Sequence, residues 1–173
     1  MASRDRSFII PFVGLKLGKH DFEFSIGDEF FENYEYTVIH EANIKGTLEL
    51  EKKESMLIGE FEIEGTVKTT CDRCGGDLDL PIQGAYRLIF KFEDEESEDE
   101  SLVAIGTEAY ELDTADYFYE LITVSLPSRS LHEEGECDPD VIAKLEEFTG
   151  AYDDEEDDED DVDPRWDALK GLK

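Results

Sequence analysis

Residues 61–67 read Phe-Glu-Ile-Glu-Gly-Thr-Val, with apolar and polar side chains in alternation. A period of two is typical of a β-strand that has one buried side and one solvent-facing side. Residues 46–51, Gly-Thr-Leu-Glu-Leu-Glu, alternate in the same way, with the polar residues 52–55 between the two stretches. The two stretches therefore predict a pair of long antiparallel strands.

A compact turn motif follows, Thr70-Cys71-Asp72-Arg73-Cys74-Gly75-Gly76-Asp77. Beyond it, residues 78–92 place their large apolar side chains mostly at even positions, which predicts another strand. These side chains are Ile82, Tyr86, Leu88, Phe90 and Phe92. The cysteine-containing turn is therefore expected to close a second hairpin.

The N-terminal third predicts further short elements. Residues 8–17 and 22–26 indicate two strands joined as a hairpin through Gly18-Lys19-His20. Residues 27–36 carry aromatic side chains at helical spacing and predict a short amphipathic helix or a loop that covers a sheet edge. Residues 101–110 predict one more short strand.

Two helices are predicted after the strands. Asp113 is a candidate N-cap for the first helix, which should end at Pro127. Asp138-Pro139 begins the second helix. The expected buried side chains are Tyr117, Phe118, Leu121, Ile122 and Val124 in the first helix and Val141, Ile142, Leu145 and Phe148 in the second. The fold class is therefore α+β: an antiparallel sheet, curled towards a barrel by glycines in its strands, with helices on one side.

Acidic residues dominate the composition. The chain has 47 Asp and Glu against 16 Lys and Arg, a formal net charge of -31. Residues 93–100 hold seven acids in eight positions, and residues 153–163 hold ten in eleven. Such a chain is repelled by phosphate backbones and anionic membranes, so direct nucleic-acid binding is disfavoured. The remaining body is still acidic, which favours basic protein partners.

The domain organisation follows from the second acidic run. We expect a single domain over residues 1–150 and a disordered acidic tether from residue 151 onward, because like charges repel and bury no apolar area. The tether leads to Asp163-Pro164, then Arg165, Trp166 and Leu169, a short amphipathic segment with the only tryptophan. This segment either docks on its own domain or binds a partner, and both interpretations remain open.

The cysteines predict a metal site. Cys71-x2-Cys74-Gly75 has the form of a metal knuckle, with two thiolates spaced to share one tetrahedral ion. His132-x4-Cys137, in the stretch between the predicted helices, supplies one imidazole and the remaining thiol. Together these four residues predict a structural Cys3His zinc site. The alternative is that the cysteines are reduced and packed as small apolar residues beside a surface histidine.

Other functional classes find little support in the sequence. The chain has no nucleophile-elbow motif, phosphate-binding glycine loop or dinucleotide fingerprint. No stretch is long and apolar enough for a secretory signal or a membrane span. Three cysteines do not make a disulfide framework and suit a reducing compartment. We therefore expect a cytoplasmic protein that is not an enzyme.

Three segments together resemble the YceD family of large ribosomal RNA subunit accumulation proteins. They are the cysteine turn with Leu80-Pro81-Ile82 behind it, the stretch from Leu126-Pro127 to His132 and Cys137, and the ending Asp163-Pro164-Arg165-Trp166-Asp167-Ala168-Leu169. The resemblance spans about residues 40–173. It departs at Gly75-Gly76, where relatives usually carry a larger residue and an acid.

The resemblance implies a factor needed for large-subunit ribosomal RNA to accumulate, without a known enzymatic step. Because the chain is so acidic, we expect its partner to be a basic large-subunit ribosomal protein or the assembling large subunit. Arg165, Trp166 and Leu169 are the expected partner-binding residues. Two alternatives stay open: an RNA-processing or thiol-dependent enzyme that uses the cysteines, and an acidic mimic of nucleic acid.

Overall fold

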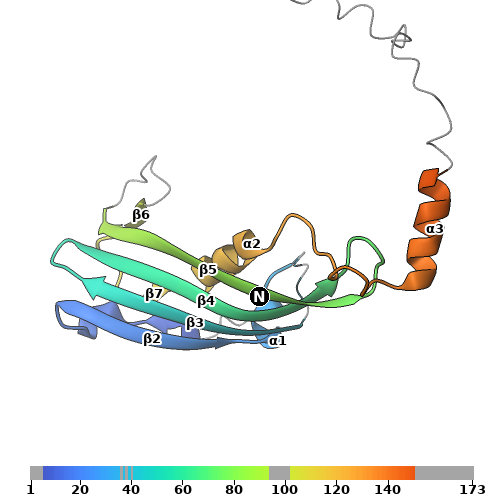
Figure 1. The fold of residues 1–173 in the computed structure, drawn as a ribbon. Coiled ribbons are helices and arrows are strands. Elements are labelled where there is room, and N and C mark those ends of the chain that lie inside the picture. Colours follow the sequence, from blue (N-terminus) through green and yellow to red (C-terminus); the bar gives the residue numbers. More distant parts are fainter. Residues whose placement is uncertain (1–5, 36, 38, 40, 94–101, 151–173) are drawn as a thin grey trace, which may run out of the picture. The chain divides into compact units, whose positions relative to one another are not determined.

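Among the residues that the structure describes, five strands form the main sheet, in the spatial order β2-β3-β4-β5-β6 (Figure 1). The strands are β2 (Gly18–Ile26), β3 (Glu41–Lys52), β4 (Met56–Thr70), β5 (Asp77–Phe92) and β6 (Leu102–Ile105). The first four are antiparallel neighbours, whereas β6 runs parallel to β5. The α+β class is confirmed. The expected curl towards a barrel is wrong, because β2 and β6 are the two outer strands and do not pair.

The computed structural model describes residues 6–35, 37, 39, 41–93 and 102–150. The chain divides into two units, residues 1–132 and 133–173. The predicted disorder of the acidic tail falls on residues 151–173, outside the described part. The predicted domain boundary at residue 150 stays a prediction. No helix in the described ranges is both long and apolar enough to cross a membrane.

The predicted hairpins around β4 are confirmed. Leu48 of β3 pairs with Phe61 of β4, and Thr70 pairs with Asp77 across the cysteine turn. The alternation seen in the sequence places Phe61 and Ile63 on one face, where both are buried, and Glu62 on the other, where it is exposed. The hydrophobic pattern therefore fixes which side of this sheet is covered.

The predicted N-terminal hairpin is wrong. The segment forms a 3-10 turn, η1 (Arg6–Phe8), the two-residue strand β1 (Ile9–Ile10) and a second 3-10 turn, η2 (Phe12–Gly14). Strand β1 pairs with β7 (Leu112–Asp113), and β2 pairs with β3 instead. Pro11 has no N–H to continue the strand, and the Lys52 ammonium binds the carbonyl oxygens of the turn that follows.

Three helices accompany the strands in the described residues. Helix α1 (Asp28–Phe31) is a short version of the helix expected over residues 27–36. Helix α2 (Ala115–Ser125) lies against one face of the sheet (Figure 1) and buries Phe118, Leu121 and Ile122, but Val124 is 77% exposed, contrary to prediction. The N-cap of α2 is Thr114 and not the predicted Asp113, although the Asp113 carboxylate accepts a hydrogen bond from the Ala115 N–H at 3.1 Å.

Helix α3 (Pro139–Gly150) begins where the sequence predicts, and Asp138 caps it by accepting the Asp140 N–H at 2.9 Å. The predicted burial of its apolar stripe is wrong: Leu145 is 43% exposed and Phe148 is 68% exposed. Among the described residues of the second unit, α3 is the only regular element, so this unit offers no second layer against which the stripe could pack.

The core of the first unit lies between one face of the sheet and α2. Phe118 of α2 is fully buried, and its ring centroid lies 5.2 Å from that of Phe61 on β4. Gly46 on β3 permits this close approach, because a Cβ there would lie 2.8 Å from the Phe118 ring. We call this side of the sheet the covered face and the solvent-facing side the open face.

Candidate metal centre

The turn between β4 and β5 is a compact knuckle. The Cys71 N–H donates to the Gly76 carbonyl and the Gly75 N–H donates to the Cys71 carbonyl, both at 2.8 Å. Gly75 adopts a φ of 71°, in the left-handed region that favours glycine. The prediction that this turn joins two strands is confirmed, and the turn holds both thiols at the end of the sheet.

A second segment, between α2 and the end of the first unit, reaches the knuckle through Ser130. The Asp72 N–H donates to the Ser130 carbonyl at 2.7 Å, and the Ser130 N–H donates to the Asp72 carboxylate at 2.7 Å. This two-way pairing brings His132 to the cysteines. The His132 N–H lies 3.4 Å from Cys71 Sγ, and His132 Nδ1 lies 3.3 Å from Cys74 Sγ.

The three side chains suit a tetrahedral metal ion. The ligand atoms of Cys71, Cys74 and His132 lie within 4.8 Å of one another. With metal–ligand bonds of zinc length, two ligands of a tetrahedral site lie about 3.5 Å apart. Two soft thiolates with one imidazole make a donor set typical of zinc. The structure therefore brings together three of the four residues that the sequence singled out, in an arrangement able to hold a metal ion.

The imidazole of His132 is also oriented for this role. Its Nε2 lies 2.9 Å from the carbonyl oxygen of Asp77. Because a carbonyl oxygen only accepts, Nε2 carries the proton and Nδ1 keeps its lone pair towards Cys74. The Asp77 carbonyl, followed by the Cys74 thiol, raises the pKa of His132. Sequence reasoning missed the role of Asp77, because a main-chain carbonyl has no side-chain signature.

Cys71 is held in a setting that favours its thiolate. Burial raises the pKa of this thiol, but hydrogen bonds from the backbone of His132, Cys74 and Arg73 outweigh burial and lower the pKa to about 6. A deprotonated sulfur is the form that binds a metal. The backbone hydrogen bonds thus prepare Cys71 as a ligand.

Cys137, the fourth predicted ligand, belongs to the second unit. It follows a turn in which the Glu136 N–H donates to the Glu133 carbonyl at 3.1 Å and Gly135 has a φ of 91°. The bend expected at Gly135 is therefore present. The role of Cys137 as a ligand stays a prediction. The predicted partner-binding residues Arg165, Trp166 and Leu169 lie outside the described residues.

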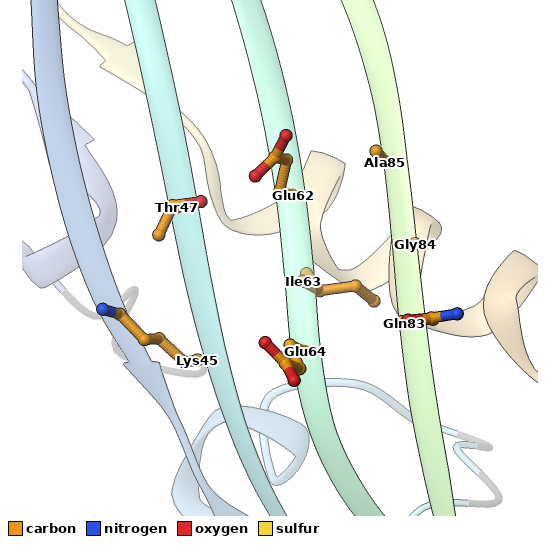
Figure 2. Close-up of a pocket in the computed structure, with 8 residues that line it drawn as sticks. All are labelled: Lys45, Thr47, Glu62, Ile63, Glu64, Gln83, Gly84 and Ala85. Carbon is orange, nitrogen blue, oxygen red and sulfur yellow. The ribbon is translucent and has the colours of Figure 1, made fainter.

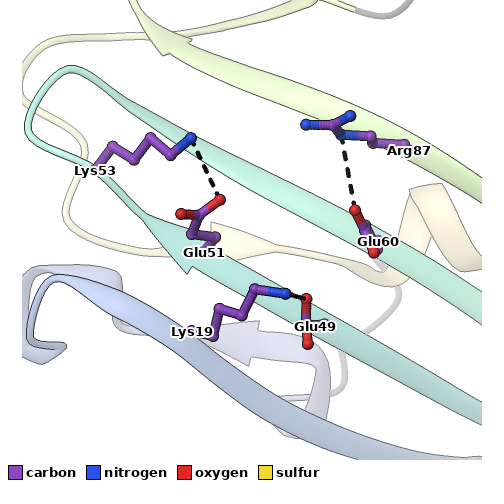
Figure 3. A network of polar contacts seen from close by, with 6 residues as sticks. All are labelled: Lys19, Glu49, Glu51, Lys53, Glu60 and Arg87. Carbon is purple, nitrogen blue, oxygen red and sulfur yellow. Dashed lines mark hydrogen bonds and ion pairs between the residues drawn. The ribbon is translucent and has the colours of Figure 1, made fainter.

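The open face of the sheet carries a network of ion pairs (Figure 3). Lys19 pairs with Glu49, Lys53 with Glu51 at 3.3 Å, and Arg87 with Glu60 at 3.9 Å. Lys45 and Lys68 also bind acids of neighbouring strands, Glu23 and Glu41, each at 2.8 Å. The basic side chains of this face are thus already engaged.

Comparison with known proteins identifies the family. Residues 59–173, which are 115 of the 173 residues, match the family described as large ribosomal RNA subunit accumulation protein YceD. No curated protein and no solved structure matches the chain. The match contains the knuckle, His132 and Cys137. The chain belongs to the YceD family, and membership implies a role in accumulation of the large ribosomal RNA subunit.

Proposed function

We propose that this member of the YceD family supports large-subunit ribosomal RNA accumulation by binding a basic ribosomal protein during assembly. The family match over residues 59–173 carries the proposal. The family is named for accumulation of an RNA and not for a reaction, so we assign the chain a non-enzymatic role in the cytoplasm, where ribosomes assemble.

The charge of the chain supports a protein partner over a direct RNA contact. A protein with a net charge of -31 gains nothing from counterion release at phosphates and is repelled by them. The same charge attracts a lysine-rich and arginine-rich protein over long distances. Arg165, Trp166 and Leu169 are proposed to add an apolar anchor that gives this attraction specificity.

We assign the knuckle a structural zinc ion bound by Cys71, Cys74, His132 and Cys137. The geometry of the first three residues supports this assignment. Cys137 follows His132 by five residues, so the length of the chain alone keeps the two Cα atoms within about 18 Å. When bound, the ion would link the β4–β5 turn to the segment after α2. The four protein ligands would fill every coordination position of the ion, as in other structural zinc sites.

The thiol-dependent enzyme is less well supported. A lowered pKa at Cys71 is typical of a nucleophile, but Cys71 is only 1% exposed, whereas catalytic cysteines are partly exposed. Alkylation of the folded protein separates the two interpretations. We expect slow reaction of Cys71 with iodoacetamide until a strong chelator is added, whereas fast reaction without chelator would favour the enzyme.

Affinity capture tests the proposed function. The full chain is immobilised and incubated with the separated proteins and RNA of dissociated large subunits, at low and at high salt. We expect retention of a small number of basic proteins, lost as the salt concentration rises. Recovery of ribosomal RNA without any ribosomal protein would contradict the proposal. Equal retention of every basic protein would instead favour the acidic mimic.

Native mass spectrometry tests the metal. We expect one zinc ion per chain prepared without chelator, and its loss from the Cys74→Ala variant. His20→Ala is the matched control, because His20 lies on β2 and contacts the Lys16 carbonyl, not the knuckle. A metal-free wild-type protein would refute the assignment.

A further inference from the structure

Strand β5 has an open edge. On one side it pairs with β4 from Asp77 to Lys91, but on the other side β6 covers only Ile89–Phe92 (Figure 1). In the described part of the chain, no strand pairs with the outer side of β5 from residue 77 to residue 88. An edge of this length presents a row of main-chain donors and acceptors to another extended chain.

The turn geometry shows which residues face outward. The Cys71 N–H bonds to the Gly76 carbonyl, so these two residues form a hydrogen-bonded pair. In an antiparallel ladder, such pairs recur every second residue along each strand. Ile82, Gly84 and Tyr86 belong to this series, so their main-chain N–H and C=O groups point to β4. The residues between them direct their groups outward; they are Asp79, Pro81, Gln83, Ala85 and Arg87. A proline is tolerated in a strand at such an outward position. The carbonyl of Asp77, which precedes them, already binds His132.

A hollow on the open face adjoins this edge. It measures about 620 Å³ and is lined by residues of β3, β4 and β5 (Figure 2). Glu62 stands in it between two short neighbours, Thr47 on β3 and Ala85 on β5. Within the described residues, neither Glu62 nor Glu64 forms an ion pair, and Lys45 at the rim pairs with Glu23.

We propose that an extended, lysine-rich or arginine-rich protein segment adds to β5 as a further strand. Its main chain bonds to Gln83, Ala85 and Arg87, and its basic side chains cross Ala85 to reach Glu62 and Glu64. Neighbouring strands lie about 4.8 Å apart, so Glu62 is two strand spacings from the added segment. The short side chain of Ala85 leaves that path clear. The proposal rests on the basic partner proposed above and places its binding site.

The acidic charge of the sheet favours a basic segment over other occupants, and the β5 edge over the β2 edge. A second copy of the chain would bring another pair of uncompensated glutamates to the first and would be repelled. The other long edge of the sheet, on β2, carries a single acid that has no ion pair with a residue the structure describes, Asp21, because its Glu23 is neutralised by Lys45. An anionic segment is repelled at both edges. The β5 edge is therefore favoured, because open main-chain groups occur there next to two uncompensated acids, Glu62 and Glu64, that line one hollow.

Amide hydrogen exchange on the wild-type protein tests the proposal directly. The probe is a ten-residue peptide of alternating lysine and threonine. The control peptide has proline in place of threonine, so its charge is equal but it lacks half of the main-chain donors. We expect the Gln83 and Ala85 amides to exchange fast in the free protein and to slow at least tenfold with the probe only. The Ile82 and Gly84 amides should be protected throughout.

Two variants provide an independent readout. Gln83→Pro removes an outward N–H while leaving the β4 pairing intact, and we expect it to weaken probe binding about tenfold relative to Gln83→Ala, which keeps the N–H. The double variant Glu62→Gln, Glu64→Gln should weaken binding of the probe peptide more than the control double variant Glu23→Gln, Glu49→Gln does. The control removes the same charge, but from acids that already form ion pairs.

Three outcomes would overturn the proposal: equal binding of probe and control peptides, unchanged exchange at Gln83 and Ala85, or protection of these amides by self-association without peptide. These outcomes are separable from failure of the proposed function. If wild-type and Gln83→Pro proteins capture the same large-subunit proteins, the function stands and the edge is refuted. If neither captures any, the function itself fails.

Discussion

The two faces of the sheet are made from the same strands but differ in burial, in charge and in their contribution to stability. On β4, Phe61 and Ile63 are buried beneath α2, whereas the residues beside them, Glu60, Glu62 and Glu64, face solvent. The covered face contributes stability through apolar burial, and each large side chain there is worth a few kcal/mol. The open face carries ion pairs between exposed groups, which contribute little. One face holds the fold together, and the other is the face that we propose binds the basic partner.

The largest expected effect is on the covered face. Phe61→Ala removes a fully buried ring that contacts Phe118, Phe90 and Tyr86, and we expect it to lower the free energy of unfolding by about 3–5 kcal/mol. Glu62→Ala, the next residue on the open face, should change it by less than about 0.5 kcal/mol. Urea denaturation measures both. Similar losses for the two variants would break the distinction between the faces.

An intermediate effect is expected where the sheet and helix approach each other. Gly46→Ala places a methyl group 2.8 Å from the Phe118 ring, and the required shift of α2 should cost about 1–3 kcal/mol. Asn43→Ala on the same strand is the control, because its side chain is exposed and should be nearly neutral. Thermal unfolding followed by circular dichroism gives the comparison. A neutral Gly46→Ala variant would mean that the helix adjusts freely.

The smallest expected effect on stability is on the open face. Glu62→Lys replaces the middle of three like charges on β4, so we expect the unfolding free energy to rise by up to about 0.5 kcal/mol at low salt and to return to the wild-type value at 1 M salt. The same variant should lose affinity for basic large-subunit proteins. A variant that is destabilised and still binds them would reverse the roles assigned to the two faces.

Much of this arrangement follows from local patterns in the sequence. Period-two alternation predicts β3, β4 and β5, and the spacing of Cys71 and Cys74 between two strands predicts the knuckle with His132 close to it. The partner of β1 could not be predicted in this way, because β7 lies about a hundred residues further along the chain and the pairing is only two residues long. The local pattern instead predicts pairing with the next strand-like segment, residues 22–26, and this prediction is wrong.

The burial of α3 shows a second limit of sequence patterns. A stripe that contains Leu145 and Phe148 indicates an apolar face but not what covers it. The open edge of β5, in contrast, has a signal in the sequence: Pro81 within an otherwise regular strand is typical of an edge. The Asp77 carbonyl that orients His132 has no signal in the sequence, because every residue has a main-chain carbonyl.

The pairing of β1 with β7 has a consequence for the time at which the fold is completed. The Phe8 carbonyl accepts hydrogen bonds from the Thr114 N–H at 3.0 Å and from its hydroxyl at 2.8 Å, and Ile10 pairs with Leu112. During synthesis, strands β2 to β5 can form successive hairpins as they emerge, since each pairs with its neighbour in the chain. Phe8 and Ile10 are translated before all of them but gain these partners only once residue 114 has emerged. The first strand to be synthesised, β1, is thus among the last to pair.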